Sequence, residues 1–187
     1  MPRLHDVWCD RPRLLLVGIN PGLRSAALGH HFAGLGNPFW RLLHAAGLTP
    51  EQLDAEDDTR LAEFGIALTN LCPRPTRAAA ELTSDEIARG RRALVRKCQQ
   101  LEPRVVGLVG VTLYGQIFGA RTGGGPGVKE GRLGGAPVFV VPNPSGLNAS
   151  FPGFAHKLIW FVRLRAFVDE SVSRASLPAL NARVSLG

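Results

Sequence analysis

The chain has 187 residues, of which 45% are apolar and 20% charged. This composition can bury the core of one globular domain and excludes a disordered chain. No apolar run reaches the ~18–20 residues that cross a bilayer, and the first residues, Met1–Asp6, hold no apolar signal core. We therefore expect a soluble cytoplasmic protein without membrane contact, nucleoid-associated if it is bacterial.

The formal net charge is +7, and 19 of the 22 basic residues are arginine. A guanidinium group binds phosphate through two parallel donors, so this surplus favours a nucleic-acid partner. An arginine-rich coding bias would produce the same counts, so charge alone does not identify the polyanion. Three cysteines, Cys9, Cys72 and Cys98, show no C-x₂-C spacing, which predicts neither a disulfide framework nor a metal site.

Four runs are almost wholly apolar, as expected for strands buried on both faces of a parallel sheet. In chain order they are Leu14–Ile19, Ile66–Leu71, Val105–Gly110 and Val138–Val141. Helical spacing separates them, which predicts a three-layer α/β/α fold with a central, mostly parallel four-stranded sheet.

The first helix with clear period follows Pro38 and carries Phe39, Leu42, Leu43 and Ala46. Thr83–Glu86 is a capping box, which predicts a helix whose apolar face is Ile87, Leu94, Val95, Cys98 and Leu101. A final helix carries Leu158, Phe161, Val162 and Val168.

Glycine-rich residues 121–135 are expected to form a loop or loose hairpin. We expect a single domain over residues 1–170 and a poorly ordered tail over 171–187.

Asparagines follow three of the four predicted strands: Asn20, Asn70 and Asn143. The carboxyl ends of parallel strands meet at one edge, where ligands bind. Asparagine next to proline or glycine is also an ordinary turn former. Three amides at corresponding places nevertheless favour recognition of a base, because an amide offers a donor and an acceptor side by side.

The segments Gly18–Gly22 (GINPG) and Asn143–Leu147 (NPSGL) resemble the two signature boxes of the mismatch-specific uracil/thymine-DNA glycosylases, a branch of the uracil-DNA glycosylase superfamily. The resemblance spans roughly residues 13–165 and includes Phe32-Ala33, Asn37–Trp40, Thr69–Leu71, Arg74–Thr76, Arg89–Arg91 and Phe151-Pro152. It implies a DNA repair glycosylase that flips uracil out of mismatched DNA and hydrolyses the base–deoxyribose bond, leaving an abasic site. Thymine and other modified pyrimidines are further candidate bases.

The resemblance also implies roles for individual residues and no cofactor. Asn20 would position the attacking water, and Phe32 would stack on the flipped base. Asn70 would read the pyrimidine edge, with Ile19 and Asn143 completing the base pocket. Core packing for Phe32 and turn closure for Asn70 are the alternatives.

In the second box, Leu147 would be the wedge that fills the gap in the base stack, with an ordinary buried leucine as the alternative. Backbone groups around Ser145 and Gly146 would hold DNA. The family often has a polar residue and then arginine after the leucine, whereas Asn148-Ala149 follow here. Strict preference for a G mismatch is therefore in doubt, and single-stranded DNA becomes a second substrate beside duplex DNA with G:U mismatches.

An asparagine cannot take a proton from water effectively, so a carboxylate is sought elsewhere. Asp85 is the first candidate and Glu81 the second, although Asp85 equally suits a helix dipole. DNA affinity would come from the loop arginines Arg24, Arg74 and Arg77 and from a helical stripe of Arg89, Arg92 and Arg96, for which a solvated helix face is the alternative. We expect a monomer.

Two other functions fit parts of the pattern. A binder of damaged or mismatched DNA with little turnover would keep the fold and the boxes. A nucleotide-binding enzyme would use Gly18–Gly22 around a phosphate, but this segment lacks the spacing of the known phosphate-binding loops.

Overall fold

The computed structural model describes residues 4–119, 124–145 and 150–176. At its centre is a five-stranded sheet in the order β2-β1-β3-β5-β4. Four strands are parallel, and β4 pairs with β5 in the antiparallel sense. The strands are β1 Leu14–Gly18, β2 Ile66–Asn70, β3 Val106–Val109, β4 Gly127–Leu133 and β5 Ala136–Val141.

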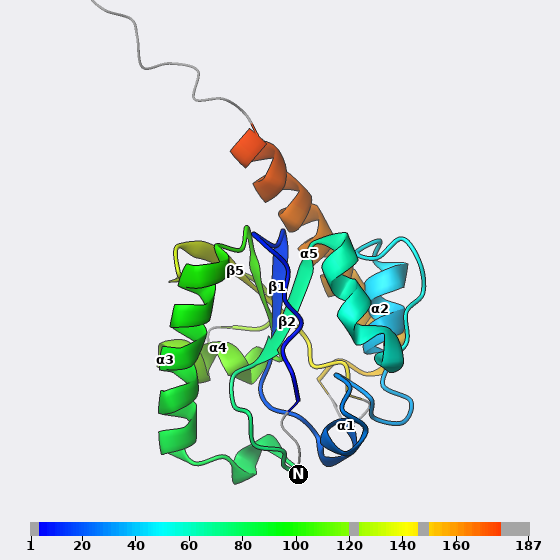
Figure 1. Ribbon diagram of the computed structural model, residues 1–187. Coiled ribbons are helices and arrows are strands. Elements are labelled where there is room, and N and C mark those ends of the chain that lie inside the picture. The colour runs from blue at the N-terminus through cyan, green and yellow to red at the C-terminus, as the bar shows by residue number, and fades with distance from the viewer. Residues whose placement is uncertain (1–3, 120–123, 146–149, 177–187) are drawn as a thin grey trace, which may run out of the picture.

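Helices cover both faces of the sheet, which confirms the predicted α/β/α layering (Figure 1). One face carries α3 (Ser84–Leu101) and α4 (Val111–Phe118), and the other carries α2 (Phe39–Ala45), the 3₁₀ helix η1 (Ala55–Phe64) and α5 (Gly153–Ser176). Two short elements, α1 (Leu23–Leu28) and the 3₁₀ turn η2 (Ala79–Glu81), belong to the connections after β1 and β2. Among the described helices, none is long and apolar enough to cross a membrane.

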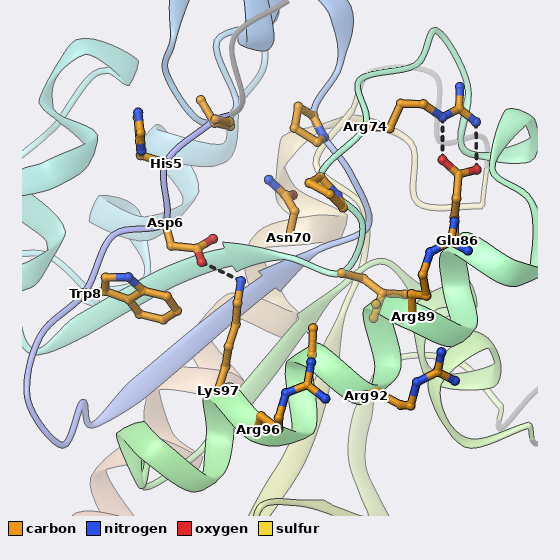
Figure 2. Close-up of a pocket in the computed structure, with 16 residues that line it drawn as sticks. His5, Asp6, Trp8, Asn70, Arg74, Glu86, Arg89, Arg92, Arg96 and Lys97 are labelled. Atoms are coloured by element: carbon orange, nitrogen blue, oxygen red, sulfur yellow. Dashed lines mark hydrogen bonds and ion pairs between the residues drawn. The ribbon is translucent and has the colours of Figure 1, made fainter.

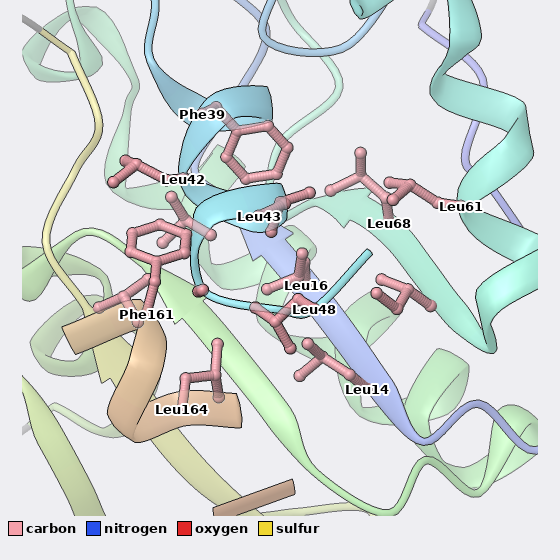
Figure 3. Packing of buried hydrophobic residues seen from close by; sticks show 14 of the residues in the cluster. Leu14, Leu16, Phe39, Leu42, Leu43, Leu48, Leu61, Leu68, Phe161 and Leu164 are labelled. Carbon is pink, nitrogen blue, oxygen red and sulfur yellow. The ribbon is translucent and has the colours of Figure 1, made fainter. Parts of the chain in front are cut away.

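The core is divided by the sheet because neighbouring side chains of a strand point to opposite faces. In β1, Leu14 and Leu16 pack towards α2 and α5, whereas Leu15 and Val17 pack towards α3 and α4. Figure 3 shows the first of these clusters, in which β1 leucines meet α2 and α5 side chains. All four residues are fully buried, so the continuous apolar runs correctly predicted strands buried on both sides.

The capping box at the start of α3 is confirmed. The Thr83 side chain accepts a hydrogen bond from the backbone N–H of Glu86 at 3.2 Å, and the Glu86 carboxylate accepts one from the backbone N–H of Thr83 at 2.9 Å. Of the predicted apolar face, Leu94 and Cys98 are buried, but Val95 is 37% exposed. One residue rotates the side chain by about 100° around a helix, which turns Val95 away from the core.

The sheet has five strands rather than the predicted four. Residues 127–133 form β4, which turns at Gly134-Gly135 and returns as β5. The charged side chains of β4 conceal its strand character, because an edge strand needs only one buried face. At the other end of the domain, α5 crosses the expected boundary at residue 170 and continues to Ser176, while residues 177–187 lie outside the described residues.

Candidate active site

A cleft of about 250 Å³ opens at the carboxyl edge of the sheet. It lies at the ends of β1, β2 and β5, where neighbouring connections leave the sheet in different directions. Six residues predicted for the site line it together: Ile19, Asn20, Phe32, Asn70, Asn143 and Ser145. The two boxes, far apart in the chain, therefore meet at one place.

The Asn20 side chain is held firmly by its amide nitrogen. This nitrogen donates to the Thr76 hydroxyl at 2.7 Å, to the carbonyl of Arg74 at 2.9 Å and to the carbonyl of Pro21 at 3.3 Å. Carbonyl oxygens can only accept, so these contacts decide which end of the amide is nitrogen. The amide oxygen accepts no hydrogen bond from any described residue, which leaves it available to a water molecule in the cleft.

Thr76 provides part of this support, and sequence reasoning assigned it no role. Its backbone N–H donates to the Pro21 carbonyl at 3.2 Å, and its hydroxyl donates to the Ala78 carbonyl at 2.8 Å. Thr76 is buried, and it forms a short parallel bridge with Gly22. The loop after β2 thereby closes over the loop after β1.

Phe32 forms a wall of the cleft in a strained conformation. Its φ is +51°, in the left-handed region that non-glycine residues seldom occupy. The backbone N–H groups on either side are bound by side chains, His31 N–H by Asp58 at 2.9 Å and Ala33 N–H by Ser25 at 3.0 Å. The Phe32 ring stacks on Phe39 with centroids 3.8 Å apart. Strain maintained by its surroundings is typical of functional sites.

Asn70 ends β2 beside Gly18, the last residue of β1. A Cβ atom on Gly18 would lie 2.5 Å from the Asn70 side-chain oxygen and 3.6 Å from Cζ of Phe32. Glycine is therefore required at this position for the Asn70 amide to lie so close to the end of β1. In the described part of the chain, nothing hydrogen-bonds to the Asn70 side chain, so the amide is available to a ligand.

The second box begins at the end of β5. The Asn143 side-chain oxygen accepts the backbone N–H of Ser145 at 2.9 Å, and the carbonyl of Ser145 accepts from Lys157 Nζ at 3.1 Å. Lys157 is buried in α5, and no signal in the sequence marked it. Predicted site residues Gly146, Leu147 and Asn148 lie outside the described residues.

The sequence places His31 in a loop, where an exposed side chain that could touch a phosphate is expected, but the structure buries it. It lines the cleft, is almost fully buried, and its Nε2 lies 2.8 Å from the His5 carbonyl. That carbonyl requires Nε2 to carry the proton. Burial lowers the pKa of His31, so the ring is neutral at pH 7.

The proposed carboxylate catalyst does not reach the cleft. Asp85 is exposed in the first turn of α3 and lines neither this cleft nor the larger groove beside it, and Glu81 is exposed too. Glu81 accepts the backbone N–H of Ala78 at 2.8 Å. Within the described ranges, no Asp or Glu lines the cleft.

Of the predicted DNA-binding arginines, Arg77 lines the cleft, and Arg24 donates to the carbonyl of Ala33 at 3.0 Å. Arg74 instead donates hydrogen bonds to both oxygens of the Glu86 carboxylate, at 2.6 and 2.9 Å. This guanidinium, with the backbone N–H of Thr83, lowers the pKa of Glu86 to about 2. Across the described residues, no three His, Cys, Asp or Glu side chains gather as a metal site would need.

Two comparisons with known proteins bear on this site. The family model described as "Uracil DNA glycosylase superfamily" matches residues 5–164. Among solved structures, the chain is similar to one described as a "putative Uracil DNA glycosylase" from Methanosarcina acetivorans, with a TM-score of 0.61 and 19% identity over 89% of this chain and 97% of that one. At this identity the second likeness shows the fold alone.

Proposed function

Because the chain belongs to the uracil DNA glycosylase superfamily, we propose that it excises uracil from mismatched DNA as a monofunctional glycosylase. Membership supports DNA glycosylase activity, a hydrolase activity of DNA repair. The narrower proposal is that uracil opposite guanine is flipped into the cleft and released, leaving an abasic site. Its partner would be duplex DNA with G:U mismatches, with single-stranded DNA as a second substrate, bound by a monomeric cytoplasmic protein.

The observation that carries the proposal is the fixed orientation of the Asn20 amide. Three acceptors hold its nitrogen, so its oxygen can accept one proton of a water and direct that water's lone pair towards a sugar. The C1′–N bond breaks and its electron pair leaves with the base, while the oxygen of the water bonds to C1′. The proton that this water loses passes through solvent to the departing base anion, so the products are a C1′ hydroxyl and neutral uracil. Such positioning contributes to catalysis without a strong base.

Asn70 supports the choice of uracil. Its amide can accept from the N3–H of uracil and donate to O4, whereas cytosine presents an acceptor at N3 and a donor at C4. Phe32, whose ring packs on Phe39, would stack on the base plane. Wrong pairing leaves buried polar groups unsatisfied, which is the physical basis of discrimination.

The test is excision from 5′-labelled oligonucleotides with one uracil, as U:G, U:A and single strand, followed by alkali. Asn20→Ala should lower the single-turnover rate by about 100-fold, the scale found when one oriented polar group is removed, with DNA affinity nearly unchanged. Asn37→Ala is the matched control. Asn37 also lines the cleft, but its side-chain oxygen already accepts a hydrogen bond from the backbone N–H of Phe39. Equal rates in wild type and Asn20→Ala would overturn the role of Asn20.

A lesion-binding protein with little turnover is the second candidate, favoured by the lack of a carboxylate among the described cleft residues. It predicts tighter binding to U:G than to C:G duplex with no alkali-labile product. Cleavage of U:G alone would support the mismatch-specific enzyme. Cleavage of all three substrates would keep the enzyme and remove the mismatch preference.

A further inference from the structure

A second, larger hollow lies beside the cleft and extends along α3. Its volume is about 1030 Å³. One wall is α3 and the other is the N-terminal segment with Asp6 and Trp8, and Asn70 lies between them (Figure 2). Asn70 and Pro21 line both hollows, so this groove is continuous with the cleft.

The groove carries an uncompensated positive charge. Its two acids are already used, since Asp6 pairs with Lys97 at 2.5 Å and Glu86 pairs with Arg74. Three exposed arginines, Arg89, Arg92 and Arg96, line the groove and make no ion pair within the described ranges. They lie along α3 at spacings of three and four residues and cover about 10 Å of its axis.

The opposite wall offers an aromatic surface. Trp8 is 44% exposed, and Lys97 Nζ lies 5.3 Å from its ring centroid. Lys97 also donates to the buried Thr69 hydroxyl at 2.8 Å, which joins the N-terminal segment, β2 and α3. The indole is therefore held at the groove wall instead of being buried in the core.

A cationic stripe facing an exposed aromatic ring is the arrangement by which proteins bind single-stranded nucleic acid, with arginines along the phosphates and bases on the ring. A duplex stacks its bases internally, so it offers no free base face to the Trp8 ring. We propose that the groove along α3 binds a short single-stranded DNA segment, separate from the base that enters the cleft. This goes beyond the excision proposal, since it requires no uracil.

The test is fluorescence anisotropy of a labelled, uracil-free oligothymidylate with the full chain. Arg89→Gln/Arg96→Gln should weaken binding and reduce the slope of log K against log salt by about 1.4, because each phosphate contact contributes about 0.7 on a single strand. The matched control is Arg91→Gln/Arg104→Gln, which removes the same charge from two exposed arginines outside the groove. Equal losses in the two double variants would overturn the proposal.

Substitutions of Trp8 distinguish the contribution of base stacking to DNA binding from that of the arginine charges. Trp8→Leu should weaken oligothymidylate binding by about 5- to 140-fold, the range for one base stacked on an aromatic ring, and Trp8→Phe should restore most of it. If Trp8→Leu and Trp8→Phe bind the oligothymidylate with the same affinity, no base stacks on Trp8 and the proposal fails. Equal loss of affinity for a uracil-free duplex would show that the groove binds phosphate without selecting single strands, and preference for a polyglutamate peptide would identify an acidic protein segment instead; either result overturns the proposal.

Discussion

Replacing Gly18 by alanine should damage base recognition while leaving the fold intact. The added Cβ would lie 2.5 Å from the Asn70 side-chain oxygen, and such atoms almost never approach within 3.0 Å, so the amide must retreat by at least about 0.5 Å. The φ of Gly18 is not positive, so its backbone tolerates alanine. The Asn70 side chain has no hydrogen bond to a described residue to lose, so its displacement costs little stability.

The effect on catalysis is much larger, since a misplacement near 1 Å can cost about 100-fold in rate. We expect kcat/KM on U:G duplex to fall about 10- to 100-fold and the Tm to change by less than about 4 °C, the equivalent of 1 kcal/mol in a domain of this size. Gly22→Ala is the control from the same loop, because a Cβ at that position meets no described atom within 4 Å. Full activity of Gly18→Ala would refute the role of Asn70, and unfolding would show that the contact is structural.

Three further predictions test features around the site. Glu86→Gln should lower the urea midpoint of unfolding relative to wild type above pH 5, and this difference should vanish as the pH falls from 4.5 to 2. The reason is that the Arg74 guanidinium depresses the pKa of the Glu86 carboxyl to about 2 in the folded chain only. A difference that stays constant down to pH 2 would contradict the ion pair. Lys157→Met should slow excision from U:G duplex about tenfold, because it removes one hydrogen bond from the loop after β5. The Tm should stay level or rise, because the substitution removes a buried charge. A large fall in Tm with normal excision would assign this lysine to stability instead. Gly90→Ala should lower the Tm by about 2–12 °C despite the better helix propensity of alanine, because the new Cβ would lie 2.3 Å from the backbone carbonyl oxygen of Leu71, just after β2. An increase in Tm would show that α3 shifts freely.

The sequence was most informative where one residue type implies one environment. Apolar runs predicted the four buried strands, and the Thr83–Glu86 pattern predicted the start of α3. The asparagines after β1, β2 and β5 were correctly expected at one edge, because parallel strands end together. The superfamily followed from the two boxes.

Other features depend on contacts between loops, which no local pattern carries. The support of Asn20 by Thr76 exists only because the loop after β2 closes over the loop after β1. Positive φ at Phe32 likewise depends on bonds to residues distant in the chain. Asp85 was preferred as a catalyst by position, but one step along the helix rotates the side chain by about 100°, and it is Glu86 that reaches the groove.

The order of the strands along the chain determines when the cleft can form during synthesis of the protein. Asn20 follows β1 and Asn70 ends β2, and these two neighbouring strands lie in the first half of the chain. Asn143 and Ser145 follow β5, the last strand within the described residues. A nascent chain that has not yet emerged beyond β5 lacks one side of the cleft, and β3 lacks a partner on that flank. Truncated translation products that end before β5 therefore lack Asn143 and Ser145 and cannot assemble the complete cleft.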